Sequence, residues 1–254
     1  MKIYVLNLVK HKILKITAAV LLTLTVISSI AIGIAAEFYG KNLRKIQADA
    51  LPYDKIIILD AGHGGEDPGA VADGGIYEKD LNLQIALEIG KILEEKGYIV
   101  VYTRTDDKLL YKEEENVKGI RKISDLKNRC KFADRYPGSI FVSIHMNSFG
   151  SSKYSGLQVY YSLDNQQSLS LANSVQERVV NDIQNSNKRV TKPGKDMYIL
   201  EHISNPAILI ECGFITNREE LKKLSEKEYQ KQLSFSIVCG IIDYIEKNNN
   251  DKGS

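Results

Sequence analysis

The sequence predicts an α/β protein: a single domain whose twisted, mostly parallel sheet has helices on both faces, behind an apolar amino-terminal segment. Short apolar runs rich in Ile, Val and Tyr alternate with longer segments whose apolar residues recur at helical spacing. This alternation implies crossover connections between parallel strands, and such a sheet needs cover on both faces. The 254 residues are 43% hydrophobic and 26% charged, which suits one sizeable core.

The first 15 residues contain four lysines, and an uncharged, mostly apolar stretch follows from Ile16 to Ala36. About 20 apolar residues are enough to cross a bilayer, and basic residues on the near side keep that end in the cytoplasm. A secretory signal peptide has the same layout. We therefore expect residues 1–36 to act as a membrane anchor or a cleaved signal, and residues 37–53 to form a polar linker.

The domain is expected to run from residue 54 to residue 247, followed by a polar tail over residues 248–254. Its first strand is the apolar run Ile56–Leu59. The helix Asp80–Lys96 comes next, because apolar residues recur on one of its faces and Gly97 marks its end. The remaining elements follow the same two patterns. In order, they are strand Ile99–Tyr102, helix Ser124–Arg135, strand Ile140–Ile144, strand Leu157–Tyr161, helix Ser168–Ile183, strand Ala207–Ile210 and helix Glu226–Lys247.

The charge balance argues against a nucleic-acid partner. The chain has 34 Lys and Arg against 32 Asp and Glu, but four of the lysines precede the first acidic residue, Glu37. Residues 37–254 therefore carry a slight net negative charge. A protein that neutralises phosphates needs a basic surface, so we expect no nucleic-acid binding.

The three cysteines, Cys130, Cys212 and Cys239, are odd in number and widely separated. An exported domain stabilised by disulfides would contain more of them, in an even number. We interpret Cys212 and Cys239 as small core residues. Because the sequence has no Cys-x-x-Cys pair, any zinc ion would not be held by thiolates.

Three side chains that can bind a metal or transfer a proton follow predicted strands. His63 follows the first strand in the run Asp-Ala-Gly-His-Gly-Gly, and His145 follows the third in Ser-Ile-His-Met-Asn. Glu211 follows the strand that ends at Ile210. Ligands of open α/β sheets bind beyond the carboxyl ends of the strands. The three side chains are therefore expected to converge at one edge of the sheet.

Each of these residues also has an ordinary structural interpretation. A histidine after a strand is often a hydrogen-bonded loop residue, and the glycines around His63 suit a tight turn. Other catalytic motifs are missing: the sequence has no Gly-Lys-Ser/Thr phosphate loop, no Gly-x-Ser-x-Gly and no His-Glu-x-x-His. Because buried strands deliver all three side chains to one edge, the functional interpretation is favoured.

Two histidines and a carboxylate, with one position left for water, form a recurrent hydrolytic zinc site. Glu78, just before the first predicted helix, is well placed to complete the set, and Glu66 and Asp67 are alternatives. An acidic residue at a helix start is also favoured by the helix dipole. Spacing alone does not choose among the three.

Several segments, taken in order from about Lys55 to Tyr244, resemble the zinc-dependent N-acetylmuramoyl-L-alanine amidases of the amidase-3 type. The resemblance implies that zinc is bound by His63, Glu78 and His145, and that Glu211 is catalytic. The matching segments are Ile57–Ala70 (IILDAGHGGEDPGA), Glu78–Asp80, Thr103–Arg104, Ser143–Asn147 and Pro206–Asn217 (PAILIECGFITN).

The same resemblance suggests substrate contacts at Arg104, Arg129 and Asn147. Arg129 matches an arginine of the family, whereas Ala133-Asp134 stands where Ala-Asn is usual. The implied reaction is hydrolysis of the amide bond between the lactyl group of N-acetylmuramic acid and L-alanine in peptidoglycan. Glu211 would be the general base, and the alternative for it is a fourth metal ligand.

The architecture narrows the expected role. Between His145 and Glu211 the patterns indicate only a strand, one helix and a short Lys-Pro-Gly loop, so we expect no extra helix of the kind that blocks the site in regulated members, and wall-binding repeats are missing. One amidase domain behind an export segment is similar to the sporulation amidases that help make muramic lactam in spore cortex. We expect an extracytoplasmic enzyme with peptidoglycan as its partner and an activating protein as a further one. The alternatives are a catalytically silent wall-binding protein and a zinc peptidase.

Overall fold

The chain divides into two compact units, residues 1–51 and residues 52–254, and the sheet and helices below belong to the second. The expected export segment and linker, residues 1–53, lie outside the described residues except for four helical positions near the amino terminus. Within the described residues, no helix is both long enough and apolar enough to span a bilayer. The computed structural model of the protein describes Thr25, Ser28, Ser29, Gly33 and residues 55–111, 114 and 121–252.

A mixed sheet of six strands forms the centre of the domain, in the order β2-β1-β3-β6-β4-β5. β1, β2, β3 and β6 run parallel to one another, whereas β4 pairs antiparallel with β6, and β5 runs parallel to β4. The sheet is therefore mostly parallel, as predicted. The strands are β1 (Ile56–Ala61), β2 (Ile99–Tyr102), β3 (Ile140–Asn147), β4 (Gln158–Tyr161), β5 (Lys192–Pro193) and β6 (Ala207–Phe214).

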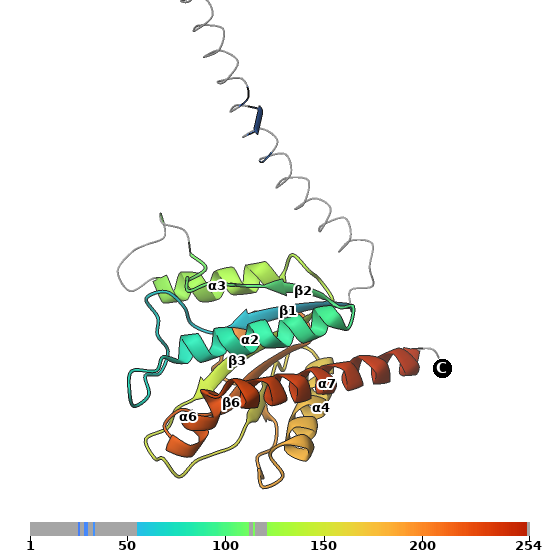
Figure 1. The fold of residues 1–254 in the computed structure, drawn as a ribbon. Coiled ribbons are helices and arrows are strands. Elements are labelled where there is room, and N and C mark those ends of the chain that lie inside the picture. The colour runs from blue at the N-terminus through green and yellow to red at the C-terminus, as the bar shows by residue number, and fades with distance from the viewer. Residues whose placement is uncertain are drawn as a thin grey trace, which may run out of the picture. The chain divides into compact units, whose positions relative to one another are not determined.

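Helices cover both faces of this sheet. On one face α2 and α4 each pack against α7, all three helices join the apolar core with the strands, and Figure 1 shows α2 and α7 lying next to each other across the sheet. On the other face α3 and α5 complete a smaller apolar cluster. The helices are α2 (Glu78–Glu95), α3 (Arg121–Ala133), α4 (Gln167–Asp182), α5 (Tyr198–His202), α6 (Arg218–Leu224) and α7 (Lys227–Lys252).

The strands contribute alternate residues to the two faces, because successive side chains of a strand point to opposite sides. In β3, Ile140, Val142, Ile144 and Met146 all join the large core under α2, α4 and α7. The residues between them begin with Phe141 in the smaller cluster and become polar toward the carboxyl end of the strand. One face is therefore apolar along its whole length, while the other changes from apolar to polar.

All five predicted strands are present, but β1, β3 and β6 continue past their predicted ends by two to four residues. His145 and Glu211 therefore lie within strands, not after them. Sequence patterns missed β5, α5 and α6, which are only two to seven residues long. The last helix continues to Lys252, so most of the expected polar tail is helical, because each added residue of a formed helix gains a backbone hydrogen bond.

The cysteines behave as expected for small core residues. All three are free thiols; Cys130 and Cys212 are buried and Cys239 is partly buried. Burial is the largest cause that raises the pKa of Cys130, to about 12. The Cys130 thiol therefore stays neutral under ordinary conditions and packs as an apolar group.

Candidate active site

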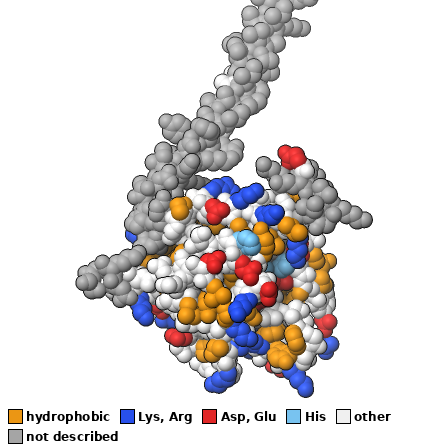
Figure 2. Space-filling view, turned by 180° about the vertical axis from the view of Figure 1, so that it is seen from behind, with side chains coloured by type: hydrophobic (Ala, Val, Ile, Leu, Met, Phe, Trp, Pro, Cys, Tyr) orange, Lys and Arg blue, Asp and Glu red, His pale blue; other side chains and the backbone are white. Residues whose placement is uncertain are grey.

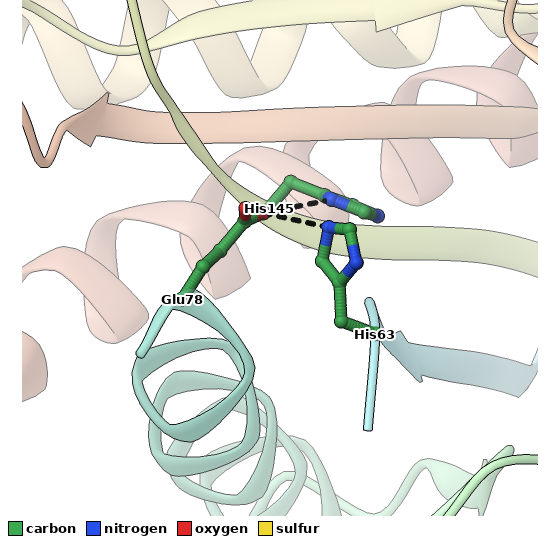
Figure 3. Close-up of side chains that lie close together, drawn as sticks. All are labelled: His63, Glu78 and His145. Carbon is green, nitrogen blue, oxygen red and sulfur yellow. Dashed lines mark hydrogen bonds and ion pairs between the residues drawn. The ribbon is translucent and has the colours of Figure 1, made fainter. Parts of the chain in front are cut away.

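The side chains of His63, Glu78 and His145 meet at the carboxyl edge of β1 and β3 (Figure 3). Their possible ligand atoms all lie within 4.8 Å of one another. Glu78 Oε1 lies 3.2 Å from His63 Nε2 and 3.1 Å from His145 Nδ1. The two histidines, which the sequence analysis expected at one edge of the sheet together with Glu211, lie close together there, and Glu78, not Glu66 or Asp67, completes this group of possible ligands.

Tight backbone approaches bring the three side chains together. His63 has a left-handed backbone with φ 61°, which turns the chain sharply after β1. The ring of His145 lies over Gly62, where a Cβ would collide with it. Gly69, with φ 67°, leaves space that Glu78 and His63 occupy. The glycines of this loop thus give the histidines and the carboxylate room to approach one another.

Backbone amides and the histidines hold Glu78 as a carboxylate at the start of α2. Its Oε2 accepts a hydrogen bond from the Ala70 amide at 2.9 Å, and its Oε1 accepts one from the Met146 amide at 3.1 Å. Burial alone would raise the pKa of Glu78, but the hydrogen bonds and charges of His145 and His63 lower it strongly. The group therefore stays ionised and able to bind a cation.

Asp67 supports His63 from behind. Its Oδ2 lies 2.9 Å from His63 Nδ1, and its Oδ1 accepts a hydrogen bond from the Gly69 amide at 3.1 Å. Burial lowers the pKa of His63, but hydrogen bonds and charges of Asp67 and Glu78 outweigh it and raise the pKa to about 9. Positive charge is thus stabilised between these carboxylates, as a metal site requires. Glu66 is elsewhere, in an ion pair with Arg121.

The ligand atoms of this group, and the charges around them, suit a metal ion. Two imidazoles and one carboxylate face a common point, and a second carboxylate fixes one imidazole from outside, an arrangement typical of metal-binding histidines. Figure 2 shows histidine, acidic and apolar side chains gathered on one face of the domain. The His63, Glu78 and His145 group can therefore hold a metal, and we call it the metal trio.

Glu211 lies on the strand next to the metal trio. β3 and β6 pair in parallel with His145 opposite Glu211, so the two side chains lie on the same face of neighbouring strands. Glu211 Oε2 is buried and has no hydrogen-bond partner in the described part of the chain. Burial is the main cause that raises the pKa of Glu211, to about 7. Such a carboxyl can gain and lose a proton near neutral pH.

Arg104 and Arg129 do not face solvent; the side chains are only 2% and 1% exposed. Arg104 donates to the carbonyls of Ala61 and Gly62 at 2.9 and 3.0 Å. Arg129 donates to the carbonyls of Ala61 and His63 at 2.9 and 2.8 Å. The expectation that these arginines contact substrate is therefore wrong. They fix the backbone that carries His63, because a guanidinium offers several donors in a rigid plane.

Asp60 is the buried anion that balances this network, and sequence patterns gave it no role. Its carboxylate accepts hydrogen bonds from Arg129 at 2.5 Å, Thr103 at 2.7 Å and Ser143 at 2.6 Å. Burial raises the pKa of Asp60, but Arg129 and the two hydroxyls together lower it. The sequence does contain a signal for this role of Asp60, namely a charged residue inside an apolar strand, because a buried charge requires partners.

Asn147 ends β3, where it is partly exposed near the same edge. Its backbone carbonyl accepts a hydrogen bond from the Ile215 amide at 2.9 Å, which joins β3 to the end of β6. A bulge between His145 and Asn147 shifts the pairing there. Substrate contact by the Asn147 side chain stays a prediction.

Comparisons with known proteins agree with this geometry. The family described as N-acetylmuramoyl-L-alanine amidase matches residues 57–243. The germination-specific N-acetylmuramoyl-L-alanine amidase of Bacillus subtilis (strain 168) is 34% identical over 191 residues, which cover 75% of this chain and 80% of that protein.

Solved structures give the same result. The structure of the CwlD amidase from Clostridioides difficile in complex with the GerS lipoprotein superposes with a TM-score of 0.72 at 41% identity, covering 75% of this chain and 98% of that one. The catalytic domain of CwlV, an amidase from Bacillus (Paenibacillus) polymyxa var. colistinus, gives 0.62 at 30% identity, covering 75% and 98%.

Together, the fold, the site and these matches define a hydrolase that acts on peptidoglycan of the cell wall. The chain belongs to the N-acetylmuramoyl-L-alanine amidase family, and this amidase activity is its function.

Proposed function

We propose that the protein is a zinc-dependent amidase in which the metal trio binds zinc and Glu211 is the general base. The juxtaposition of His145 and Glu211 on paired strands carries this proposal. It puts an acid–base group next to the ligand set, on the same face of the sheet. When bound, zinc would polarise the scissile carbonyl and lower the pKa of the attacking water.

The protein's own groups would perform the remaining work. Glu211 would take the proton of the attacking water at its buried Oε2 and then deliver it to the L-alanine nitrogen as the bond to the lactyl group breaks. Its raised pKa suits both directions of transfer. Asp67 would hold His63 by its Nδ1, so that Nε2 faces the site.

The decisive test is mass spectrometry of products from purified peptidoglycan, together with the zinc content of the enzyme. The proposal predicts stem peptides with a free L-alanine amino group and about one zinc per chain. Cleavage inside the stem peptide would instead indicate a peptidase, and intact peptidoglycan would indicate a silent wall-binding protein. Either result would contradict the proposal.

We further propose that the enzyme acts outside the cytoplasm in the maturation of spore cortex, held by a membrane anchor or released after signal cleavage. The similarity to the germination-specific enzyme of Bacillus subtilis supports this role. Cortex from spores of a deletion strain should then lack muramic lactam. Unchanged cortex composition would limit the enzyme to vegetative wall.

A protein partner is also proposed, because the CwlD amidase was solved in complex with the GerS lipoprotein. The partner would raise the activity or metal content of this enzyme. Full turnover and full zinc occupancy of the purified protein alone would contradict a required activator.

A further inference from the structure

Arg189 lies beside the active site in the loop between α4 and β5, and the protein holds its guanidinium rigidly. Its Nε donates to the Ser155 carbonyl at 2.8 Å, and its Nη1 donates to Gln158 Oε1 at 3.1 Å. Its Cζ lies 4.5 Å from the centroid of the Phe214 ring, which places the cation over an aromatic face. A flexible side chain is thus fixed in one position.

Gln158 connects Arg189 to β6, the strand that carries Glu211. β4 pairs antiparallel with β6, and Gln158 lies directly opposite Glu211, so the two side chains occupy the same face of the sheet. Gln158 is only 2% exposed, and its Nε2 donates to the Val190 carbonyl at 2.8 Å. The loop that carries Arg189 is therefore tied to the strand position next to Glu211.

Tyr160 gives further evidence that the loop carrying Arg189 lies near Glu211. Its hydroxyl donates to Gln158 Oε1 at 3.4 Å. Burial and the charge of Glu211 raise the pKa of Tyr160, while Arg189 acts in the opposite direction. The tyrosine therefore lies in the fields of both charged groups.

Arg189 has no acidic partner: within residues 55–111 and 121–252, no carboxylate oxygen forms an ion pair with it. A partly buried cation is usually paired, since partial desolvation is costly. Arg129, in contrast, contacts both Asp60 and Asp125. A fixed guanidinium whose charge no carboxylate of these residues balances, at the edge of an active site, is suited to bind an anion of the substrate.

Distances along the sheet indicate which anion this is. Gln158 lies two strands away from His145, about 10 Å at the usual strand spacing. An extended peptide advances about 3.5 Å per residue, so the second residue after the scissile bond extends from about 3.5 to about 7 Å from it, and a guanidinium that donates to its carboxylate lies about 3 Å farther. The span matches the acidic residue that follows L-alanine in the stem peptide.

We propose that Arg189 binds the free carboxylate of the stem-peptide residue that follows L-alanine, and so makes the enzyme select acidic over amidated stem peptides. This inference rests on the proposed function. The exposed rings of Phe149 and Tyr154 pack edge to face beside Arg189. They line the same end of the site. Arg189 is thus a specificity-determining residue.

The test compares kcat/KM on two muramyl peptides that differ only at the second residue, with a free carboxylate or with its carboxamide. We expect the wild-type enzyme to prefer the acid by roughly 10- to 100-fold, as for a hydrogen bond to a charged group. R189Q should lose this preference, with a ratio near 1, mainly by slower cleavage of the acid. R189K should keep part of it, because lysine retains the charge but not the planar fork.

The ratio within one variant does not depend on the fraction of enzyme that is folded, so partial misfolding of R189Q cannot imitate the result. R135Q is the matched control: Arg135 also lies over an aromatic ring, 4.7 Å from Phe132, but at the amino end of β3, away from the site. Equal cleavage of both peptides by the wild type, or an unchanged preference in R189Q, would overturn the inference. Failure of the wild type to cleave either peptide would instead overturn the proposed function.

Discussion

The two faces of the central sheet use the same strands for different purposes. On the face under α2, α4 and α7, β3 contributes four apolar residues in succession, from Ile140 to Met146. On the opposite face, the same strand proceeds from Phe141 through Ser143 to His145. The apolar face stabilises the fold over its whole length, while the other face becomes a site only at its carboxyl end.

This difference shows how the domain supports ionised groups without losing its core. A charged group must be paired or solvated, and each polar residue on the site face has such a solution. Asp60 is paired with Arg129, and His145 lies against Glu78 at the rim. Glu211 is the exception, since its Oε2 has no partner. In the described part of the chain, this buried oxygen without a hydrogen bond lies on the strand next to the metal trio.

Replacement of a ligand on the site face should have the largest effect. H145A removes one of the three donors, so zinc content and turnover should fall together, turnover by roughly 10⁴-fold or more. Metal analysis and the peptidoglycan assay on the same sample measure both. H202A is the control, because His202 is exposed on α5 and outside the metal trio. Full zinc occupancy in H145A would contradict the ligand assignment.

E211Q separates proton transfer from metal binding. Glutamine keeps the size of the side chain but does not take up a proton, so turnover should fall by about 10²- to 10⁴-fold with zinc still near one per chain. KM should change little, because the lost interaction belongs to the transition state. If added zinc restores activity, Glu211 is a metal ligand instead. Near-normal turnover would remove it from the mechanism.

The sequence predicted the sheet and three of the four central site residues for a simple reason. An apolar run identifies a buried strand, and the polar residue at its carboxyl end must lie at the edge where ligands bind, as for His63, His145 and Glu211. Glu78 needed the family resemblance. It reaches the site only because the loop after β1 folds back, with the Glu78 amide donating to the Ala70 carbonyl at 2.9 Å.

The arginines show what residue type alone does not determine. Arg104 and Arg129 were expected to face substrate, but both point inward to backbone carbonyls around His63. Arg189, which the sequence patterns did not single out, is the one that bonds Gln158, the residue paired with Glu211 across β4 and β6. Whether an arginine faces the site or the interior depends on which carbonyls and carboxylates lack partners nearby, and that is settled only by tertiary packing.

D60N tests the buried network of the site face through stability. Neutralising Asp60 leaves Arg129 buried with a single carboxylate, so the free energy of unfolding should fall by about 3–5 kcal/mol. D106N is the control; Asp106 pairs with Lys108 at the surface, and its loss should cost less than about 1 kcal/mol. Urea unfolding at pH 7 measures both. Equal costs would show that the network contributes no more than a surface pair.

The dependence of the unfolding free energy on pH should provide a second test of Asp60. Because the folded protein lowers the pKa of Asp60 below its ordinary value of 3.8, this carboxylate stabilises the fold fully above about pH 4. Its contribution is lost as the pH falls through the folded-state pKa. The wild-type unfolding free energy should therefore decrease more steeply below pH 4 than that of D60N. Parallel pH profiles would contradict the assignment.

The smallest effect should come from replacing Ile210, the residue before Glu211 in β6, whose side chain lies on the apolar face. Ile210 is fully buried under α4 and α7, so I210V removes one methyl group from the core and should cost about 0.5–1.5 kcal/mol. Its kcat and zinc content should stay at wild-type values, because the side chain points away from the metal trio. E211Q should do the reverse and leave stability unchanged or slightly higher, since a neutral amide is easier to bury than an unpaired carboxylate. Thermal unfolding and kcat of the two variants, measured side by side, test whether adjacent residues of one strand divide stability and catalysis between the two faces. A lower kcat in I210V would mean that packing on the apolar face also sets the position of Glu211.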